Sequence, residues 1–93
     1  MRLALVTASL DAENTFSDWV TIRGSFNFSL SGSWVATVHF QRSFDKGVTP
    51  LDVESFNANV ERIGKEPEEG VWYRFGIKAG NHTSGTIIGR ISQ

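Results

Sequence analysis

Apolar and polar residues alternate through the middle of the chain. Trp34, Ala36, Val38 and Phe40 share one parity, and the positions between them are mostly polar. A two-residue period is typical of a β-strand that has one face on a core. The alternation therefore predicts one long strand from Trp34 to Gln41.

This strand leads into the stretch from Ser43 to Thr49. Ser43, Asp45, Gly47 and Thr49 supply the short polar side chains and the glycine that tight turns require. We therefore expect a tight acidic turn here.

A second alternating run extends from Val20 to Leu30, with Ile22, Phe26 and Phe28 on its apolar side. The run matches a half-buried strand. Gly24 in its middle predicts a bend, a bulge or a close approach of another backbone.

The residues Ser31-Gly32-Ser33 separate the two runs and predict a hairpin. A three-residue loop would pair Leu30 with Trp34 and keep both apolar faces on one side. A two-residue loop would put Trp34 on the wrong face.

The rest of the chain also reads as short strands separated by polar turns. We expect strands at Arg2–Ala8, Leu51–Phe56, Ala58–Ile63, Val71–Lys78 and Thr86–Ser92, a polar connection at Ser9–Ser17, and loops at Gly64–Gly70 and Ala79–Gly85. The pattern predicts an all-β fold, an antiparallel β-sandwich of about seven strands. The core positions expected are Phe28, Trp34, Val38, Phe40, Tyr73 and Phe75.

Length and composition narrow the classes of protein. The 93 residues suit a single domain over 1–93, with an N-terminal strand and connection at 1–17 and a sandwich body at 18–93. The net charge of −1 argues against nucleic-acid binding. The absence of cysteine excludes disulfides and thiolate sites. No apolar stretch approaches the roughly 18 residues of a membrane span, so we expect no membrane contact.

The acidic turn resembles the Asp-box, a Ser-x-Asp-x-Gly-x-Thr-Trp hairpin of sialidases and other β proteins. That resemblance implies a structural turn in which Asp45 accepts backbone N–H bonds and the tryptophan packs beneath. Pro50 stands at the tryptophan position. A lone carboxylate does not supply the six to eight oxygens that Ca²⁺ takes, so we expect no metal here.

No catalytic constellation emerges from the remaining polar residues. The two histidines, His39 and His82, have no nucleophile motif beside them, and Glu66, Glu68 and Glu69 share one charged stretch. We therefore expect a protein that is not an enzyme and has no cofactor, metal or catalytic residue.

Trp72 and Arg74 lie on the non-core parity of the strand Val71–Lys78. Tryptophan and arginine are enriched at interface hot spots, so we predict an interface at this pair, joined by Leu3 and Leu5 of the N-terminal segment. The alternative is that a flanking loop or the N-terminal segment covers Trp72.

Two resemblances extend this interpretation. The stretch from Tyr73 to Ala79, with a polar loop and a last strand, resembles the final strands of immunoglobulin-like and fibronectin-III domains. The stretches Gly24–Gly32, Thr37–Asp45 and Trp72–Gly76 resemble small proteins of tailed bacteriophages. This second resemblance implies a virion structural protein, which serves in capsid decoration, in head–tail joining or in the tail. Such a protein contacts virion proteins and copies of itself.

A carbohydrate-binding module is the alternative function. It would use Trp19, Trp72 and Tyr73 as a stacking platform for the rings of a glycan.

Overall fold

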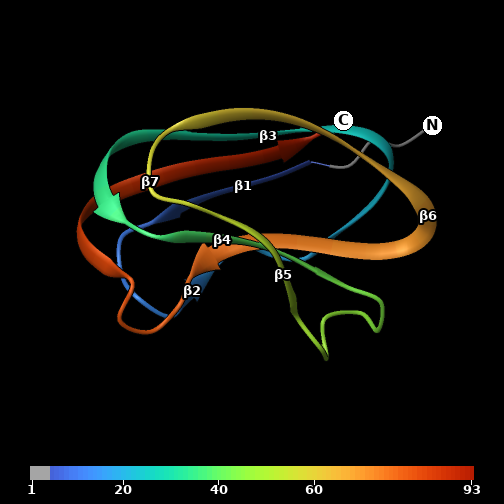
Figure 1. Cartoon of the computed structure of the whole chain (residues 1–93), viewed down its shortest axis with the longest axis horizontal. Coiled ribbons are helices and arrows are strands. Elements are labelled where there is room, and N and C mark those ends of the chain that lie inside the picture. The colour runs from blue at the N-terminus through green and yellow to red at the C-terminus, as the bar shows by residue number, and fades with distance from the viewer. Residues whose placement is uncertain (1–4) are drawn as a thin grey trace.

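In the computed structural model, which describes residues 5–93, the chain forms seven β-strands and no helix (Figure 1). The strands are β1 (Leu5–Leu10), β2 (Thr15–Phe16), β3 (Val20–Ala36), β4 (Val38–Ser43), β5 (Leu51–Phe56), β6 (Val60–Ile77) and β7 (His82–Ser92). All the pairings are antiparallel.

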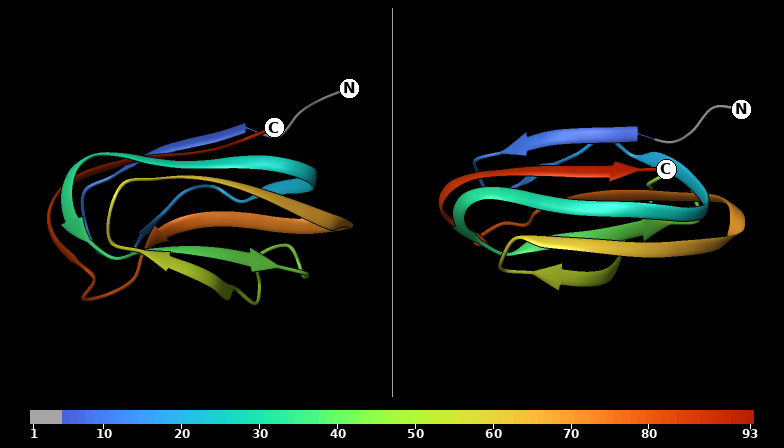
Figure 2. Two further views of the ribbon diagram at one scale, coloured as in Figure 1. Left: turned by 45° about the horizontal axis from the view of Figure 1, so that its top comes forward. Right: turned by 90° about the horizontal axis from the view of Figure 1, so that it is seen from above.

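Two long strands connect the layers of the fold. β3 and β6, of 17 and 18 residues, pair with each other, while β3 also pairs with β7 and β6 with β4. The sheet order is β1-β7-β3-β6-β4-β5, with β2 beside the end of β6. Figure 2 shows this sheet folded over, with β1, β7, β3 and the first part of β6 above β4, β5 and the last part of β6. The predicted class, an antiparallel β-sandwich of about seven strands, is confirmed.

The strand order places β3 between β6 and β7. In immunoglobulin domains the last two strands are neighbours in one sheet. The sandwich architecture is thus shared with that fold, whereas the adjacency of the last two strands is not.

Glycines mark the bends that fold the sheet over. The pairing of β3 with β6 shifts register between Ile22 and Gly24, where Gly24 has a φ of 87°. The predicted irregularity at Gly24 is therefore a bulge. β6 turns at the same level, where Gly70 has a φ of 77°. Only glycine adopts this left-handed conformation at little cost.

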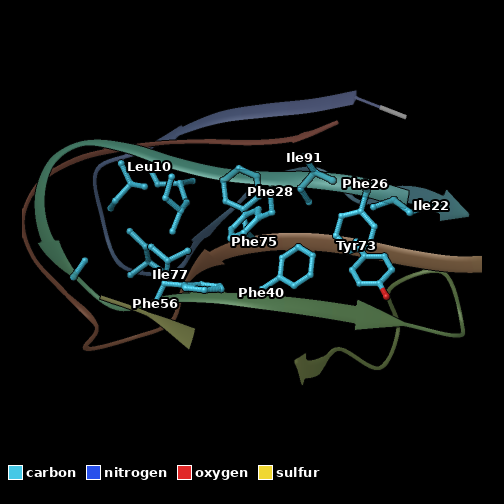
Figure 3. Close-up of a cluster of buried hydrophobic side chains, with 14 of the residues drawn as sticks. Leu10, Ile22, Phe26, Phe28, Phe40, Phe56, Tyr73, Phe75, Ile77 and Ile91 are labelled. Carbon is cyan, nitrogen blue, oxygen red and sulfur yellow. The ribbon is translucent and has the colours of Figure 1, made fainter. Parts of the chain in front are cut away.

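Aromatic rings fill the space between the layers (Figure 3). Phe28 lies at the centre, with ring centroids 4.6 Å from Phe40 and 5.5 Å from Phe75. Gly89 leaves room for the Phe75 ring, because a Cβ there would lie 2.2 Å from it. Of the six predicted core residues, Phe28, Val38, Phe40, Tyr73 and Phe75 are buried. Trp34 is only partly buried and packs against the edge of the core.

The predicted hairpin at Ser31-Gly32-Ser33 is wrong. β3 continues without a break through these residues, and Leu30 pairs with Gly89 on one side and Val60 on the other. One continuous strand keeps the same alternation that the loop was meant to preserve. Pairing with β7 across residues 27–36 outweighs the local turn tendency of Ser-Gly-Ser.

The predicted single strand from Trp34 to Gln41 is interrupted at Thr37. β3 ends at Ala36 and β4 begins at Val38, so the chain changes layer at this corner (Figure 1). The Thr37 N–H donates to the backbone oxygen of Asn81, which satisfies the donor that the corner removes from the sheet.

The predicted charged loop at Gly64–Gly70 lies within β6 instead. Gly64, Lys65 and Glu66 pair with β3, and the Glu66 side chain is buried. There the Glu66 carboxylate accepts a hydrogen bond from the Tyr73 hydroxyl.

The other predicted boundaries move by a few residues. β1 begins within the predicted N-terminal strand, whose residues 2–4 lie outside the described part of the chain. β6 begins at Val60 rather than Ala58, and β7 begins at His82, inside the predicted loop.

Candidate functional site

The predicted pair Trp72 and Arg74 lies in the layer formed by β4, β5 and the last part of β6. Both side chains are on the face away from the core and are half-buried. β2 crosses beside β6 at Gly76, where a Cβ would lie 2.1 Å from the Phe16 ring. The missing side chain lets Phe16 approach Arg74.

Arg74 is held between two aromatic rings. Its guanidinium carbon lies 4.0 Å from the ring centroid of Phe16 and 4.5 Å from that of Trp19. Its Nε donates to Gln41 Oε1 at 2.9 Å. Partial burial lowers the pKa of Arg74 from its usual value. The residues before β3 therefore cover Arg74, and its interface role stays a prediction.

A chain of polar contacts continues from Arg74 across the same face. Gln41 donates from Nε2 to Asp52 Oδ1 at 2.9 Å, and Lys78 Nζ donates to Asp52 Oδ2 at 2.5 Å. Lys78 and then Gln41 hold the pKa of Asp52 below its usual value. Together these contacts link β4, β5 and the end of β6.

The acidic turn is organised by two side chains. The Ser43 hydroxyl donates to Asp45 Oδ1 at 2.5 Å and accepts the Gly47 N–H at 2.9 Å. Asp45 Oδ1 also accepts the Thr49 N–H at 2.8 Å. The bonds from Ser43 and then Thr49 lower the pKa of Asp45 to about 2.

An aromatic ring also packs against this turn, from a distant part of the sequence. Gly47 has a φ of 94°, and a Cβ there would lie 2.6 Å from Trp19 Nε1. Trp19 thus packs against the turn, a role that the Asp-box resemblance assigns to a tryptophan at position 50. Sequence reasoning missed this partner, because Trp19 precedes β3 and the turn follows β4.

A buried carboxylate closes one end of the core. Glu66, which is 3% exposed, accepts the Tyr73 hydroxyl at 2.5 Å. Arg42 Nη1 lies 3.6 Å from the same carboxylate. Burial, and then the bond to Glu66, raises the pKa of Tyr73 to about 12. The local pattern did not mark this inward carboxylate, because Arg62, which shares its parity in β6, is exposed.

The burial of Tyr73 overturns the predicted stacking platform. Tyr73 is 4% exposed and faces the core, whereas Trp72 faces outward from the same strand. Trp19 is occupied by Arg74 and the turn. Trp19, Trp72 and Tyr73 therefore form no common platform.

Strand β1 presents a different kind of surface. Leu5 points outward and is 60% exposed, while Val6, Ala8 and Leu10 turn towards the core. Leu3, the other predicted contact, lies outside the described residues. Among residues 5–93 the only strand partner of β1 is β7. The other edge of the β1 backbone has no strand partner among these residues.

The opposite edge of the sheet, β5, is protected. It carries Asp52 and Glu54, and its pairing with β4 shifts register between Phe40 and Gln41. Charges and bulges are the devices that keep edge strands from pairing with other chains. β1 has neither, and it has no proline or glycine.

Residues 5–93 contain neither a cluster of metal ligands nor a membrane-spanning helix. No group of three or more His, Asp or Glu side chains could hold a metal ion. No helix there is long and apolar enough to cross a membrane.

In comparisons with protein-family models, curated proteins and solved structures, no match to this chain was found.

Proposed function

We propose that this protein is a non-enzymatic structural component that acts by protein–protein contact, and that the open edge of β1 makes the contact. The observation that carries the proposal is the unprotected, uncharged edge of β1, opposite an edge that is protected.

An open edge supplies two kinds of binding. Its free N–H and C=O groups can pair with an added strand, and exposed side chains give that pairing a preferred register. In β1 the side chain of Leu5 is available for the second role.

The assembly proposed is a bacteriophage virion, with other virion proteins and copies of this chain as partners. This part of the proposal is supported by the sequence resemblance of Gly24–Gly32, Thr37–Asp45 and Trp72–Gly76 to tailed-phage proteins. The half-buried Trp72, on the opposite layer, is proposed as a second contact.

The edge contact is tested with the double variant Leu5→Lys, Thr7→Lys. Both side chains are exposed on the outer face, so the fold should survive. Lysines on an edge strand oppose its pairing with another chain, and two copies of the variant would also bring like charges together. The matched control is Ile63→Lys, which removes an apolar side chain that is 79% exposed on β6. We expect the double variant to be depleted from assembled particles and the control to be retained. Equal incorporation of both would refute the edge contact.

The virion assignment is tested separately by mass spectrometry of virus particles. The particles are produced by the phage that encodes this chain and are purified by density centrifugation. We expect the chain in the particle fraction at a fixed ratio to the major shell or tail protein. Its recovery in the soluble fraction alone would contradict a virion role, whatever the result for β1.

A further inference from the structure

A groove of about 400 Å³ opens at the corner where β3 passes into β4. The segments that line it meet at the left end of the molecule in Figure 1, where β3 turns down and β7 begins. Trp34 and Thr37 line it from the corner, Asn57 from the β5–β6 connection, and Asn81 and Thr83 from the start of β7. Neither Trp72 nor Arg74 lines the groove.

The tryptophan in this groove is held in one orientation. Trp34 Nε1 donates to Asn59 Oδ1 at 2.7 Å, and Asn59 Nδ2 donates to the Gly32 oxygen at 3.0 Å. The indole N–H is therefore satisfied within the protein. What Trp34 presents to the groove is carbon surface in a fixed place.

Asn81 is fixed in a similar way. Its backbone oxygen accepts the Thr37 N–H at 2.8 Å, and its N–H donates to the Lys78 oxygen at 3.1 Å. Its side-chain oxygen lies 3.2 Å from His39 Nε2. These contacts turn the amide nitrogen of Asn81 into a positioned donor.

The groove also contains polar groups that the fold does not use. Within residues 5–93, the side-chain amide of Asn57, the amide nitrogen of Asn81, and the hydroxyls of Thr37 and Thr83 have no hydrogen-bond partner. Amides and hydroxyls can both donate and accept. They are the polar groups that fix the orientation of a small ligand in a pocket.

The charge of the lining selects the class of ligand. None of the described residues that line the groove is acidic or basic. A charged ligand would therefore find no ionic partner among the residues that line the groove. A neutral sugar ring suits this uncharged lining. Its hydroxyls can pair with amides and hydroxyls, and its C–H face can lie on an indole.

We propose that this groove binds a neutral sugar ring, stacked on Trp34 and hydrogen-bonded by Asn57, Asn81 and Thr83. The site is separate from the β1 edge and does not depend on the proposed assembly role. It also differs from the platform predicted from the sequence, because it shares none of those residues.

The test is an NMR titration of the ¹⁵N-labelled protein with glucose, galactose, mannose and N-acetylglucosamine and their disaccharides. Trp19, Trp34 and Trp72 give three indole signals, so two serve as internal controls. We expect saturable shifts at the Trp34 indole and at the side-chain amides of Asn57 and Asn81. Absence of shifts with every sugar of the panel, or shifts centred on Trp19 or Trp72, would overturn the proposal.

Two variants make the test specific. Asn57→Ala and Thr83→Val each remove a group that the fold does not use, and each should weaken binding on the order of tenfold with the fold unchanged. Asn27→Ala and Thr21→Val, both exposed on β3 away from the groove, are the matched controls and should bind as wild type. Undiminished binding by both groove variants would overturn the site. So would tighter binding of an acidic sugar such as a sialic acid.

Discussion

At the scale of single residues, Ser43 and Asp45 show how a short polar stretch fixes a turn. Ser43 is completely buried, and its hydroxyl connects the carboxylate of Asp45 to the N–H of Gly47. The sequence could predict these positions because the bonds span at most four residues. It could not predict Trp19 against Gly47, because that contact depends on how β4 and the residues before β3 are placed by the whole sheet.

The bonds to Asp45 predict a pH dependence of stability. The pKa of Asp45 falls from 3.8 to about 2 on folding, so the unfolded chain binds the proton more readily. The stabilisation is present above the unfolded pKa and is lost as the pH falls through the folded pKa. We expect the urea midpoint of the wild type to drop between about pH 4 and pH 2.

The control for this prediction is Asp45→Asn, which cannot titrate at that position. We expect its midpoint to be lower than that of the wild type at neutral pH, and the two midpoints to converge towards pH 2. A constant difference between the two proteins over this range would show that the carboxylate charge is not what holds the turn.

At the scale of elements, β3 and β6 show where local patterns mislead. The alternation in β3 was visible up to Leu30 and again from Trp34, but Ser31-Gly32-Ser33 has the composition of a turn. The ten residues of β3 that face β7 decide the outcome, and this pairing is between distant parts of the chain. Glu66 was missed for the same reason, since its inward position follows from pairing with β3 and from the Tyr73 hydroxyl.

The clamp that β2 and Trp19 form on β6 gives a prediction at this scale. Arg74→Ala removes two cation–π contacts and the bond to Gln41, so it should lower the free energy of unfolding by about 1–3 kcal/mol. Urea denaturation measures this loss.

The matched control is Arg23→Ala. Arg23 pairs with Glu69, and both side chains are largely exposed, at 65% and 76%. Such a pair contributes little, so we expect a loss of less than about 1 kcal/mol. If the two alanine variants were equally stable, the packing of Arg74 between Phe16 and Trp19 would not contribute to stability. A structural Arg74 also means that the predicted interface is best tested with Trp72→Ala alone.

At the scale of the whole molecule, the first and last strands lie side by side. Leu5 pairs with Ser92 and Leu10 with Ile87, so the sheet joins its first and last strands (Figure 2). These strands contribute unequally to the core. β7 supplies Ile87 and Ile91, both completely buried, and it lies between β1 and β3.

This asymmetry predicts different results for deletions at the two ends. Removing residues 1–9 takes away an edge strand and retains Leu10, whose side chain is 3% exposed. We expect a less stable protein that still unfolds cooperatively. Removing residues 87–93 takes away two buried isoleucines and the strand that connects β1 to the sheet, which should abolish the fold.

The two deletions are compared by amide dispersion in NMR spectra and by thermal unfolding. A cooperative transition in the C-terminal deletion would show that β7 is not needed to close the core. The N-terminal deletion has a second use, because it separates folding from assembly. If β1 is the contact, this variant should fold and yet be absent from particles, whereas a folded variant that still incorporates would assign the contact to another surface.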